Sequence, residues 1–438
     1  MTKPRNILFI TFDDAVAFWK YKALFGQALQ TPNLDRICAQ STAFHAAYCQ
    51  SPICSPSRAS FMSGRAPHQI GVTEAAAKVF DRIPPHDMWP TTLKQNGYFT
   101  SSGGKIILGY VPLDDDIHQV LYSDAPKSFR KDWRVPPEIS VSLGGHNGGH
   151  ATTDPADDIR FYDFQASRSA IRFFNRHKGT VPFYREVGFY GPHGPWITPL
   201  RFKQMYDPAA FTQPAAWAGG FEGSPYSDAF VDATRFPDDH DHWQKSVRNY
   251  FSALSHVDHH LGRVWDGLKA SAHGDDTVVI IASDHGLHLG ERGQFRKYTL
   301  WEQVANVPLI IHDPRQPVGQ VVSDPVGLID IGPTVMDYAG LPPLERCPGR
   351  SLRPYCDMAR DPDRAVPTVR GSSAGIRKGR YRFTRYQDGS TELYDLARDW
   401  WQTRNLGPDH PAHDAMAEAH VDCCRAYGFD PLAADAAA

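Results

Sequence analysis

The sequence predicts an α/β fold in which helices flank a large, mainly parallel central sheet. Apolar runs of strand length, rich in β-branched residues, occur at residues 6–11, 277–283 and 307–312, and a fourth candidate lies at 183–189. Continuous apolar runs are typical of strands that are buried on both faces of a sheet. These runs are therefore predicted to form the core strands.

Two stretches between these runs have helical periodicity. Apolar residues recur at three- and four-residue spacings in 242–271, and residues 158–176 form a second candidate helix. Strands that alternate with helices indicate parallel pairing. Residues 196–241 are rich in Pro, Gly, Asp and aromatic residues, so we expect an ordered insertion there, over one end of the sheet.

The character of the chain changes at about residue 341. Residues 380–386 and 391–396 look like two paired strands, and Gln387-Asp388-Gly389 between them is a hairpin turn signal. The predicted division is a catalytic domain over residues 1–340 and a small C-terminal α+β subdomain with an antiparallel sheet over residues 341–438.

Composition limits the class of protein. The chain has 438 residues, of which 41% are apolar and 22% charged, so a largely disordered protein is excluded. A net charge of -3 argues against nucleic acid as a partner. No apolar run approaches the roughly 18 residues of a membrane span, so no membrane partner is expected. The short apolar run at 7–11 ends in acidic residues and is not a signal peptide, which predicts a cytoplasmic protein. The sequence does not predict the oligomeric state.

Acidic residues follow two of the predicted strands directly. Asp13 and Asp14 follow the first strand, and Asp284 and His285 follow the strand at 277–283. The carboxyl ends of parallel strands meet at one edge of a sheet, so we expect the two pairs to converge there. Three carboxylates at one place require a cation, and an oxygen-rich set suits Ca²⁺, Mg²⁺ or Mn²⁺ better than Zn²⁺. The alternative is that the first pair only caps a helix.

The segment Cys54-Ser55-Pro56-Ser57-Arg58 predicts a helix start. Ser55 is a good N-cap and Pro56 a good first helical residue, which places Cys54 just before the helix N-terminus. Free N–H groups at this position favour anions, and Arg58 can lean back toward the same point. The alternative is a buried cysteine beside an ordinary helix cap.

Residues 54–65 (CSPSRASFMSGR) resemble the sulfatase signature C-x-P-S-R. Other motifs of that family follow in order over nearly the whole chain: Asp13-Asp14, TPNLDR at 31–36, Gly104-Lys105, Gly191-Pro192-His193, Asp284-His285 with Lys297, and ELYDL at 392–396. Residues 90–98 and the late segment look most like the branch of iduronate-2-sulfatase and choline-sulfatase.

The resemblance implies an enzyme with an alkaline-phosphatase-like sandwich fold, a sulfatase of the alkaline phosphatase superfamily. It also implies one divalent cation, usually calcium. It implies that a formylglycine-generating maturation enzyme acts transiently on Cys54. It assigns metal ligation to Asp13, Asp14, Asp284, His285 and the modified Cys54. It assigns anion binding to Arg58, Lys105 and Lys297. It also implies that His193 donates a proton to the leaving oxygen.

The charges of these residues fit a small anionic sulfate ester as substrate. Three carboxylates contribute about -3, whereas a dication with Arg58, Lys105 and Lys297 contributes about +5. The surplus of about +2 suits a sulfate monoester and the charge that it develops in the transition state.

One position departs from the family pattern. Many sulfatases have a histidine two or three residues beyond the Gly-Lys lysine, whereas this chain reads Lys105-Ile106-Ile107-Leu108. His68, His146 or His150 could replace that histidine, and the sequence does not choose among them.

Two other functions would use the same site. A phosphonate monoester or phosphodiester hydrolase would use the same formylglycine and metal site, but such enzymes tend to lack a lysine at the Lys105 position. A catalytically dead relative that binds sulfated ligands would be expected to have lost Cys54, Arg58 or a metal carboxylate. The sequence retains all of them, and this favours the sulfatase.

Overall fold

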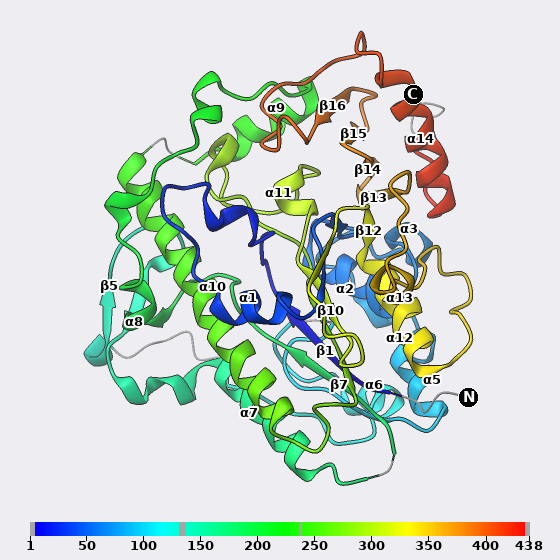
Figure 1. Cartoon of the computed structure of the whole chain (residues 1–438). Helices are drawn as coiled ribbons and strands as arrows, with labels where there is room; N and C mark the ends of the chain where they lie inside the picture. Colours follow the sequence, from blue (N-terminus) through cyan, green and yellow to red (C-terminus); the bar gives the residue numbers. More distant parts are fainter. Residues whose placement is uncertain (1–4, 108, 131–136, 180, 237–238, 434–438) are drawn as a thin grey trace.

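A seven-stranded sheet with the strand order β11-β2-β10-β9-β1-β7-β4 forms the centre of the molecule (Figure 1). The structure, a computed structural model, describes residues 5–107, 109–130, 137–179, 181–236 and 239–433. β10 runs antiparallel to both of its neighbours, and all other neighbouring pairs are parallel. The predicted mainly parallel sheet is therefore confirmed. The strands are β1 (Asn6–Phe12), β2 (Thr42–Phe44), β4 (Phe99–Ser101), β7 (Phe183–Gly188), β9 (Thr277–Ser283), β10 (Leu309–His312) and β11 (Gln320–Val322).

Strand β1 shows why the apolar runs are continuous. Leu8 and Ile10 point into the core on one face of the sheet, whereas Ile7 and Phe9 point into a second core on the other face. All four side chains are buried. Because both faces are covered, successive residues must all be apolar.

Helices cover both faces (Figure 1). The long helix α10 (His240–Lys269) packs with α7 (Tyr162–Arg176) and α1 (Pro32–Cys38) on the first face. The second face carries α2 (Cys54–Ser63), α5 (Trp89–Gln95), α6 (Asp115–Leu121) and α12 (Ile331–Ala339). Both predicted helices are present. α7 begins later than expected because residues Pro155–Arg160 form a separate 3₁₀ helix that Asp154 caps.

The 196–241 insertion is ordered over its described residues, which exclude 237 and 238. It contains β8 (Thr198–Pro199), α8 (Leu200–Lys203) and α9 (Pro225–Thr234). The side chain of Ser224 accepts a hydrogen bond from the Ser227 N–H, which caps α9. α8 and β8 both contact α10, so the insertion is anchored to the helix that covers the sheet. The remaining short elements are β3 (Ala47–Tyr48), α3 (Pro67–Ile70), α4 (Val79–Arg82), β5 (Ser140–Ser142), β6 (His150–Thr152), α11 (Glu302–Ala305), β12 (Val326–Gly327) and α13 (Arg353–Cys356).

A separate antiparallel sheet forms near the C-terminus, as predicted. Its order is β13 (Ala365–Arg370), β14 (Ser373–Lys378), β15 (Tyr381–Arg385) and β16 (Thr391–Asp395), and α14 (His413–Ala426) packs on it. The β15–β16 hairpin turns at Gly389, whose φ of +83° favours glycine. The domain boundary between residues 340 and 341 stays a prediction. Among the described residues no helix is long and apolar enough to cross a membrane.

Candidate active site

The carboxyl ends of β1 and β9 place the acidic residues together. Phe12 lies opposite Ser283 in the parallel register, so Asp13 and Asp284 leave the sheet side by side. Asp14 has a φ of +67°, which is uncommon for a residue other than glycine. Its N–H donates to Asp284 Oδ1 at 3.2 Å, and its carbonyl accepts from the Tyr250 hydroxyl at 2.7 Å. These two bonds hold the turn that exposes both carboxylates of the pair to the same space.

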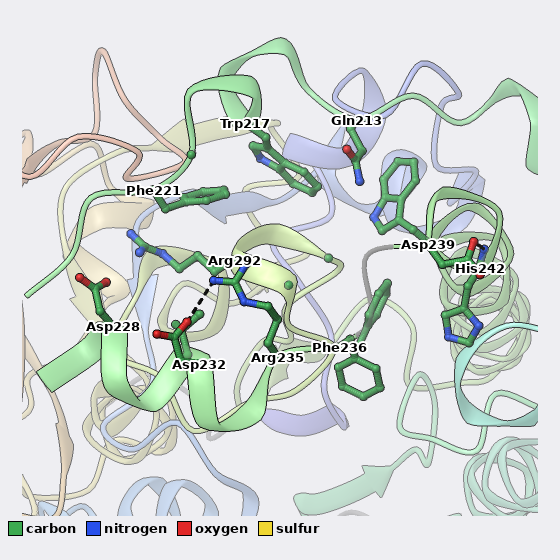
Figure 2. Close-up of a pocket in the computed structure, with 16 residues that line it drawn as sticks. Gln213, Trp217, Phe221, Asp228, Asp232, Arg235, Phe236, Asp239, His242 and Arg292 are labelled. Atoms are coloured by element: carbon green, nitrogen blue, oxygen red, sulfur yellow. Dashed lines mark hydrogen bonds and ion pairs between the residues drawn. The ribbon is translucent and has the colours of Figure 1, made fainter. Parts of the chain in front are cut away.

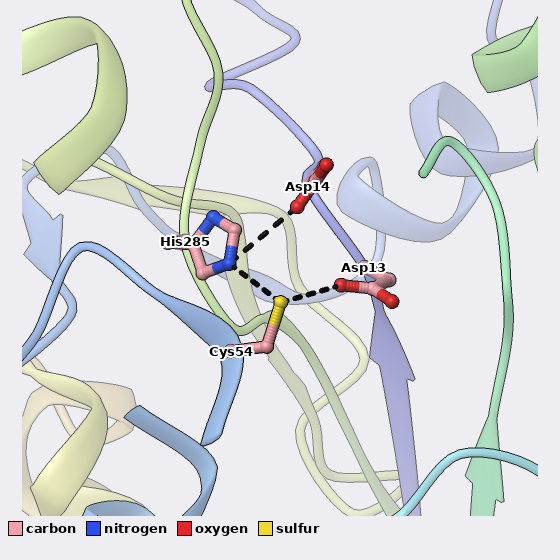
Figure 3. A group of neighbouring side chains, drawn as sticks. All are labelled: Asp13, Asp14, Cys54 and His285. Atoms are coloured by element: carbon pink, nitrogen blue, oxygen red, sulfur yellow. Dashed lines mark hydrogen bonds and ion pairs between the residues drawn. The ribbon is translucent and has the colours of Figure 1, made fainter. Parts of the chain in front are cut away.

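Cys54 lies at the first residue of α2, and not just before it as predicted. Ile53 is the N-cap, and the Ser57 N–H donates to its carbonyl at 3.1 Å, so Ser55 does not cap the helix. The Cys54 Sγ lies 3.1 Å from His285 Nε2, and its thiol donates to Asp13 Oδ1 at 3.4 Å. Figure 3 shows these residues with Asp14 around one point, where one potential ligand atom from each lies within 4.8 Å of the others.

Asp284 lies behind this group. Its Oδ2 accepts from Arg58 Nε at 2.8 Å, and its Oδ1 is 3.8 Å from His285 Nε2. The structure therefore brings the predicted metal ligands together, with Asp13, Asp14, Cys54 and His285 in one tight group and Asp284 at its edge.

Arg58 is fully buried and holds three segments of the site together. Its guanidinium donates five hydrogen bonds to protein oxygens: Asp284 Oδ2, Thr11 Oγ1 and the carbonyls of Phe12, Lys105 and Ile106. Most of its donors are thereby used within the protein. Arg58 contributes positive charge to the site, and its geometry makes it a positioning residue for β1, β9 and the Lys105 loop.

Lys105 reaches the site because two chain segments approach closely. A Cβ on Gly104 would lie 1.9 Å from the Gly188 carbonyl oxygen, so only glycine fits where the chain after β4 pairs with the end of β7. This pairing brings Lys105 Nζ to Asp13 Oδ2, to which it donates a hydrogen bond. Asp13 raises the pKa of Lys105 despite burial, which lowers it.

Lys297 contacts both the acidic pair and the cysteine. Its Nζ donates to Asp14 Oδ1 at 2.7 Å and to Cys54 Sγ at 3.2 Å. Burial would lower the pKa of Lys297, but Asp14 and the other anions raise it well above its usual value. Burial would raise the pKa of Asp13, but Lys105 and the other cations hold it well below its usual value. The two lysines and the two carboxylates are therefore all charged at neutral pH.

The thiol of Cys54 behaves differently. Burial raises its pKa to about 12, and the charge of Asp13 adds to this effect against Lys105 and Lys297. An unmodified Cys54 is therefore protonated at neutral pH, and a protonated thiol is a poor nucleophile.

His193 lies at the open side of the site. Its Nε2 is 4.0 Å from Asp14 Oδ2, and its Nδ1 lies 2.6 Å from the Gly194 carbonyl oxygen. A carbonyl oxygen can only accept a hydrogen bond, so Nδ1 carries the proton of this contact and Nε2 faces the site. The buried Asp163 fixes this turn, because its carboxylate accepts from the Tyr190 and Gly191 N–H groups.

Tyr110 is a site residue that the sequence analysis missed. Its hydroxyl donates to Asp13 Oδ2, and Lys105 Nζ lies 3.4 Å from it. Within the described residues, no hydrogen bond or ion pair joins the proposed histidines to the cluster. His68 contacts the Gly371 carbonyl, and His146 packs against Trp196 and Phe295. Tyr110 lies in a loop without a recognisable pattern, so only the fold reveals it.

The loop that carries Lys297 also borders a cavity. Residues 290–295 leave the site and form one wall of a space of about 500 Å³ (Figure 2). The insertion supplies other walls, including Trp217 and Phe221, and Arg292 lies 4.9 Å from the Phe221 ring centre. Aromatic and charged side chains of the insertion therefore meet the loop that returns to Lys297.

A mainly parallel sheet with this cluster at its carboxyl edge defines an enzyme of the alkaline-phosphatase-like class. The chain belongs to the sulfatase family, since the family model Sulfatase matches residues 5–341. It is 30% identical to the choline-sulfatase of Rhizobium meliloti, over 93% of this chain and 84% of that protein. It is 27% identical to the iduronate 2-sulfatase of Mus musculus, over 79% of this chain and 71% of that protein. These matches confirm the predicted family, branch and enzyme class.

The fold is shared with a second kind of hydrolase. The crystal structure of the phosphonate monoester hydrolase of Agrobacterium radiobacter superposes with a TM-score of 0.78 over 97% of this chain and 96% of that one. The two sequences are 20% identical, so this likeness concerns the fold alone.

Proposed function

We propose that the protein is a formylglycine-dependent sulfatase that hydrolyses a small sulfate monoester. The observation that carries this proposal is the position of Cys54 at the start of α2, within 3.4 Å of Asp13, His285 and Lys297. A hydrated aldehyde at this position would supply a hydroxyl nucleophile that the protonated thiol cannot supply. A maturation enzyme would be a transient partner for this modification.

The donor set fits a divalent cation. Asp13 and Asp14 are buried, and the low pKa of each carboxyl keeps it ionised. Their charges are balanced here by Lys105 and Lys297, whose ammonium groups occupy carboxylate oxygens that a cation would also take. Asp13, Asp14, Asp284, His285 and the modified Cys54 would hold the ion, most suitably Ca²⁺, which would polarise the ester and favour an ionised nucleophile.

Lys105 and Lys297 are the sulfate-binding residues in this proposal. Both ammonium groups stand beside Cys54 and the acidic pair, with Lys105 nearer Asp13 and Lys297 nearer Asp14. A sulfate monoester has three terminal oxygens, so two can pair with the lysines while the third faces the cation. His193 Nε2 lies on the open side, and in the imidazolium form, in which Nδ1 keeps its hydrogen bond to the Gly194 carbonyl, it would give the Nε2 proton to the leaving oxygen.

The second candidate is a phosphonate monoester or phosphodiester hydrolase, which the shared fold favours. In such a substrate a carbon or an esterified oxygen replaces one terminal oxygen. That group would face an ammonium that it cannot pair, which costs on the order of 1–3 kcal/mol.

Matured enzyme and matched aryl sulfate and aryl phosphonate esters test the proposal. We expect kcat/KM to be roughly 5- to 150-fold higher for the sulfate ester than for the phosphonate ester. This ratio corresponds to the cost of about 1–3 kcal/mol for the unpaired ammonium group. A preference for the phosphonate would replace this function by the second candidate.

A further inference from the structure

A second cavity, of about 760 Å³, lies beside β4, which is an edge strand of the central sheet. The acidic residues of the catalytic site follow β1 and β9, further along the sheet. α7 forms one wall of the cavity, the start of β4 a second, and the segment around Lys127 a third. Its volume falls within the range of pockets that bind small molecules. None of its lining residues belongs to the catalytic cluster.

The wall formed by α7 carries a row of cations. Arg168, Arg172 and Arg176 are exposed, line the cavity and follow one another at four-residue spacing. This spacing places them on one helix face, about 6 Å apart along the axis. Like charges at this spacing destabilise a helix, so the row lowers stability as long as no anion faces it.

The other walls add positive charge and little compensation. Lys178 and Lys127 also line the cavity, and the acidic lining residue Asp124 pairs with Lys127 at 2.7 Å. Within the described parts of the chain, no carboxylate forms an ion pair with the three arginines or with Lys178. The whole chain has a net charge of -3, so this concentration of cations is a local feature.

A buried cation stands behind the inner wall. Arg185 is fully buried and donates to Ser169 Oγ of the lining at 2.9 Å, and its guanidinium lies 5.4 Å from the Phe173 ring centre. Its Nε has no hydrogen-bond partner, and among the described residues no carboxylate forms an ion pair with it. Burial lowers the pKa of Arg185 to about 10, which still leaves it charged at neutral pH. This charge adds to the positive potential of the cavity.

The floor of the cavity is apolar. Phe99, Phe129 and Phe173 line it, together with Val181, which is 47% exposed. An exposed valine beside aromatic rings favours a ligand with an apolar body. The cavity is separated from the catalytic site by packed rings, since Phe129 lies 5.5 Å from Tyr162 and Tyr162 lies 5.7 Å from Tyr110.

We infer that this cavity binds an organic polyanion, a molecule with an aromatic or apolar body and two or more sulfate, sulfonate or phosphate groups. The anionic groups would face the arginine row and Lys178, and the apolar body would lie on the phenylalanines. The site is independent of catalysis and therefore of the proposed function.

The probe for the test is pyrene-1,3,6,8-tetrasulfonate, whose carbon–sulfur bonds are not ester bonds and are not substrates of a sulfatase. Its binding to the full chain is followed by fluorescence anisotropy. We expect the double variant R172E/R176E to weaken binding by at least about 10-fold, because two attractive charges become repulsive. Arg398→Glu is the control, since that side chain is 84% exposed and lies outside the cavity. It should leave binding within about twofold of the wild type.

A further variant separates this cavity from the catalytic site. Lys105→Ala should leave probe binding unchanged, and a loss equal to that of R172E/R176E would overturn the inference. Equal binding by the wild type and R172E/R176E would also overturn it. Displacement of the probe by ATP or by naphthalene-1,3,6-trisulfonate identifies phosphate or sulfonate as the preferred group, and displacement by neither contradicts an organic polyanion.

Discussion

The ammonium group of Lys297 lies 3.2 Å from the sulfur of Cys54, although the two residues are 243 positions apart in the sequence. The same ammonium donates to Asp14 at 2.7 Å, so one cation touches both the nucleophile position and the acidic pair. This relationship joins the start of α2 to the loop after β9. The proposed sulfate site therefore forms only where α2 and the loop after β9 pack together in the folded chain.

Lys105→Ala tests the role of the second ammonium group. Removal of Lys105 should lower kcat/KM for an aryl sulfate more than for the matched aryl phosphonate, because only the sulfate has an oxygen for each lysine. The expected difference is roughly 5- to 150-fold, which corresponds to about 1–3 kcal/mol. Equal losses for the two esters would show that Lys105 does not discriminate between them.

Tyr110→Phe tests whether the hydroxyl orients Asp13. Loss of this hydrogen bond should weaken calcium binding by about 10-fold or more, as the loss of groups that orient metal ligands does. Isothermal titration calorimetry on protein with unmodified Cys54 measures this without turnover. Tyr162→Phe is the matched control, because its ring packs on Tyr110 and its hydroxyl makes no hydrogen bond within the described residues. Similar calcium affinities for the two variants would argue against an orienting role.

Arg58→Ala separates a positioning role from direct substrate binding. Removal of the guanidinium leaves Asp284 as a buried charge without its partner, which should lower the free energy of unfolding by about 3–5 kcal/mol. Arg58→Lys, which keeps the charge but not the planar guanidinium, should lower the free energy of unfolding by less. Arg398→Ala should change stability by less than about 0.5 kcal/mol. If denaturation curves gave Arg58→Ala and Arg398→Ala the same free energy of unfolding, Arg58 would act only in substrate binding.

The buried Glu186 should make the free energy of unfolding depend on pH. Burial raises the pKa of Glu186 from 4.5 to about 7, and the hydroxyls of Tyr184 and Tyr122 donate to its carboxyl group. Between these pH values the unfolded chain releases this proton while the native state keeps it, so the group lowers the free energy of unfolding as pH rises.

In Glu186→Gln this pH-dependent loss is absent. The stability of the variant relative to the wild type should therefore rise by about 2–3 kcal/mol between pH 5 and pH 8. Chemical denaturation at the two pH values gives the difference, and Glu418→Gln, at an exposed position, is the matched control. A relative stability of Glu186→Gln that is constant with pH would contradict the raised pKa.

The sequence predicted the parts of the site that follow from strands and motifs. β1 and β9 are continuous apolar runs, and their parallel register brings Asp13 and Asp284 together. The sequence could not show that the Arg58 guanidinium donates its hydrogen bonds to protein oxygens, because the carbonyls of Phe12, Lys105 and Ile106 come together only in the folded chain.

Residue type and local spacing did not predict the start of α2 or the contact of Tyr110 with Asp13, because both depend on the folded backbone. Ser55 has the residue type of an N-cap, yet α2 begins at Cys54 because Ile53 accepts the first helical bond. Tyr110 is five residues beyond Lys105 in a loop, and no spacing rule relates such a hydroxyl to Asp13. Strands β13 and β14 were missed because Pro367 and Gly375 lie inside them and interrupt the pattern of a strand.

The proposed mechanism depends on the conversion of Cys54 to an aldehyde, which is measured most directly by peptide mass spectrometry on samples of known activity. Protein made with different amounts of the maturation enzyme should contain different fractions of Cys54 as the aldehyde or its hydrate. We predict that kcat for an aryl sulfate rises in proportion to this fraction and falls to nearly zero where all of Cys54 remains a thiol. Full activity in a sample whose Cys54 is entirely unmodified would contradict the account.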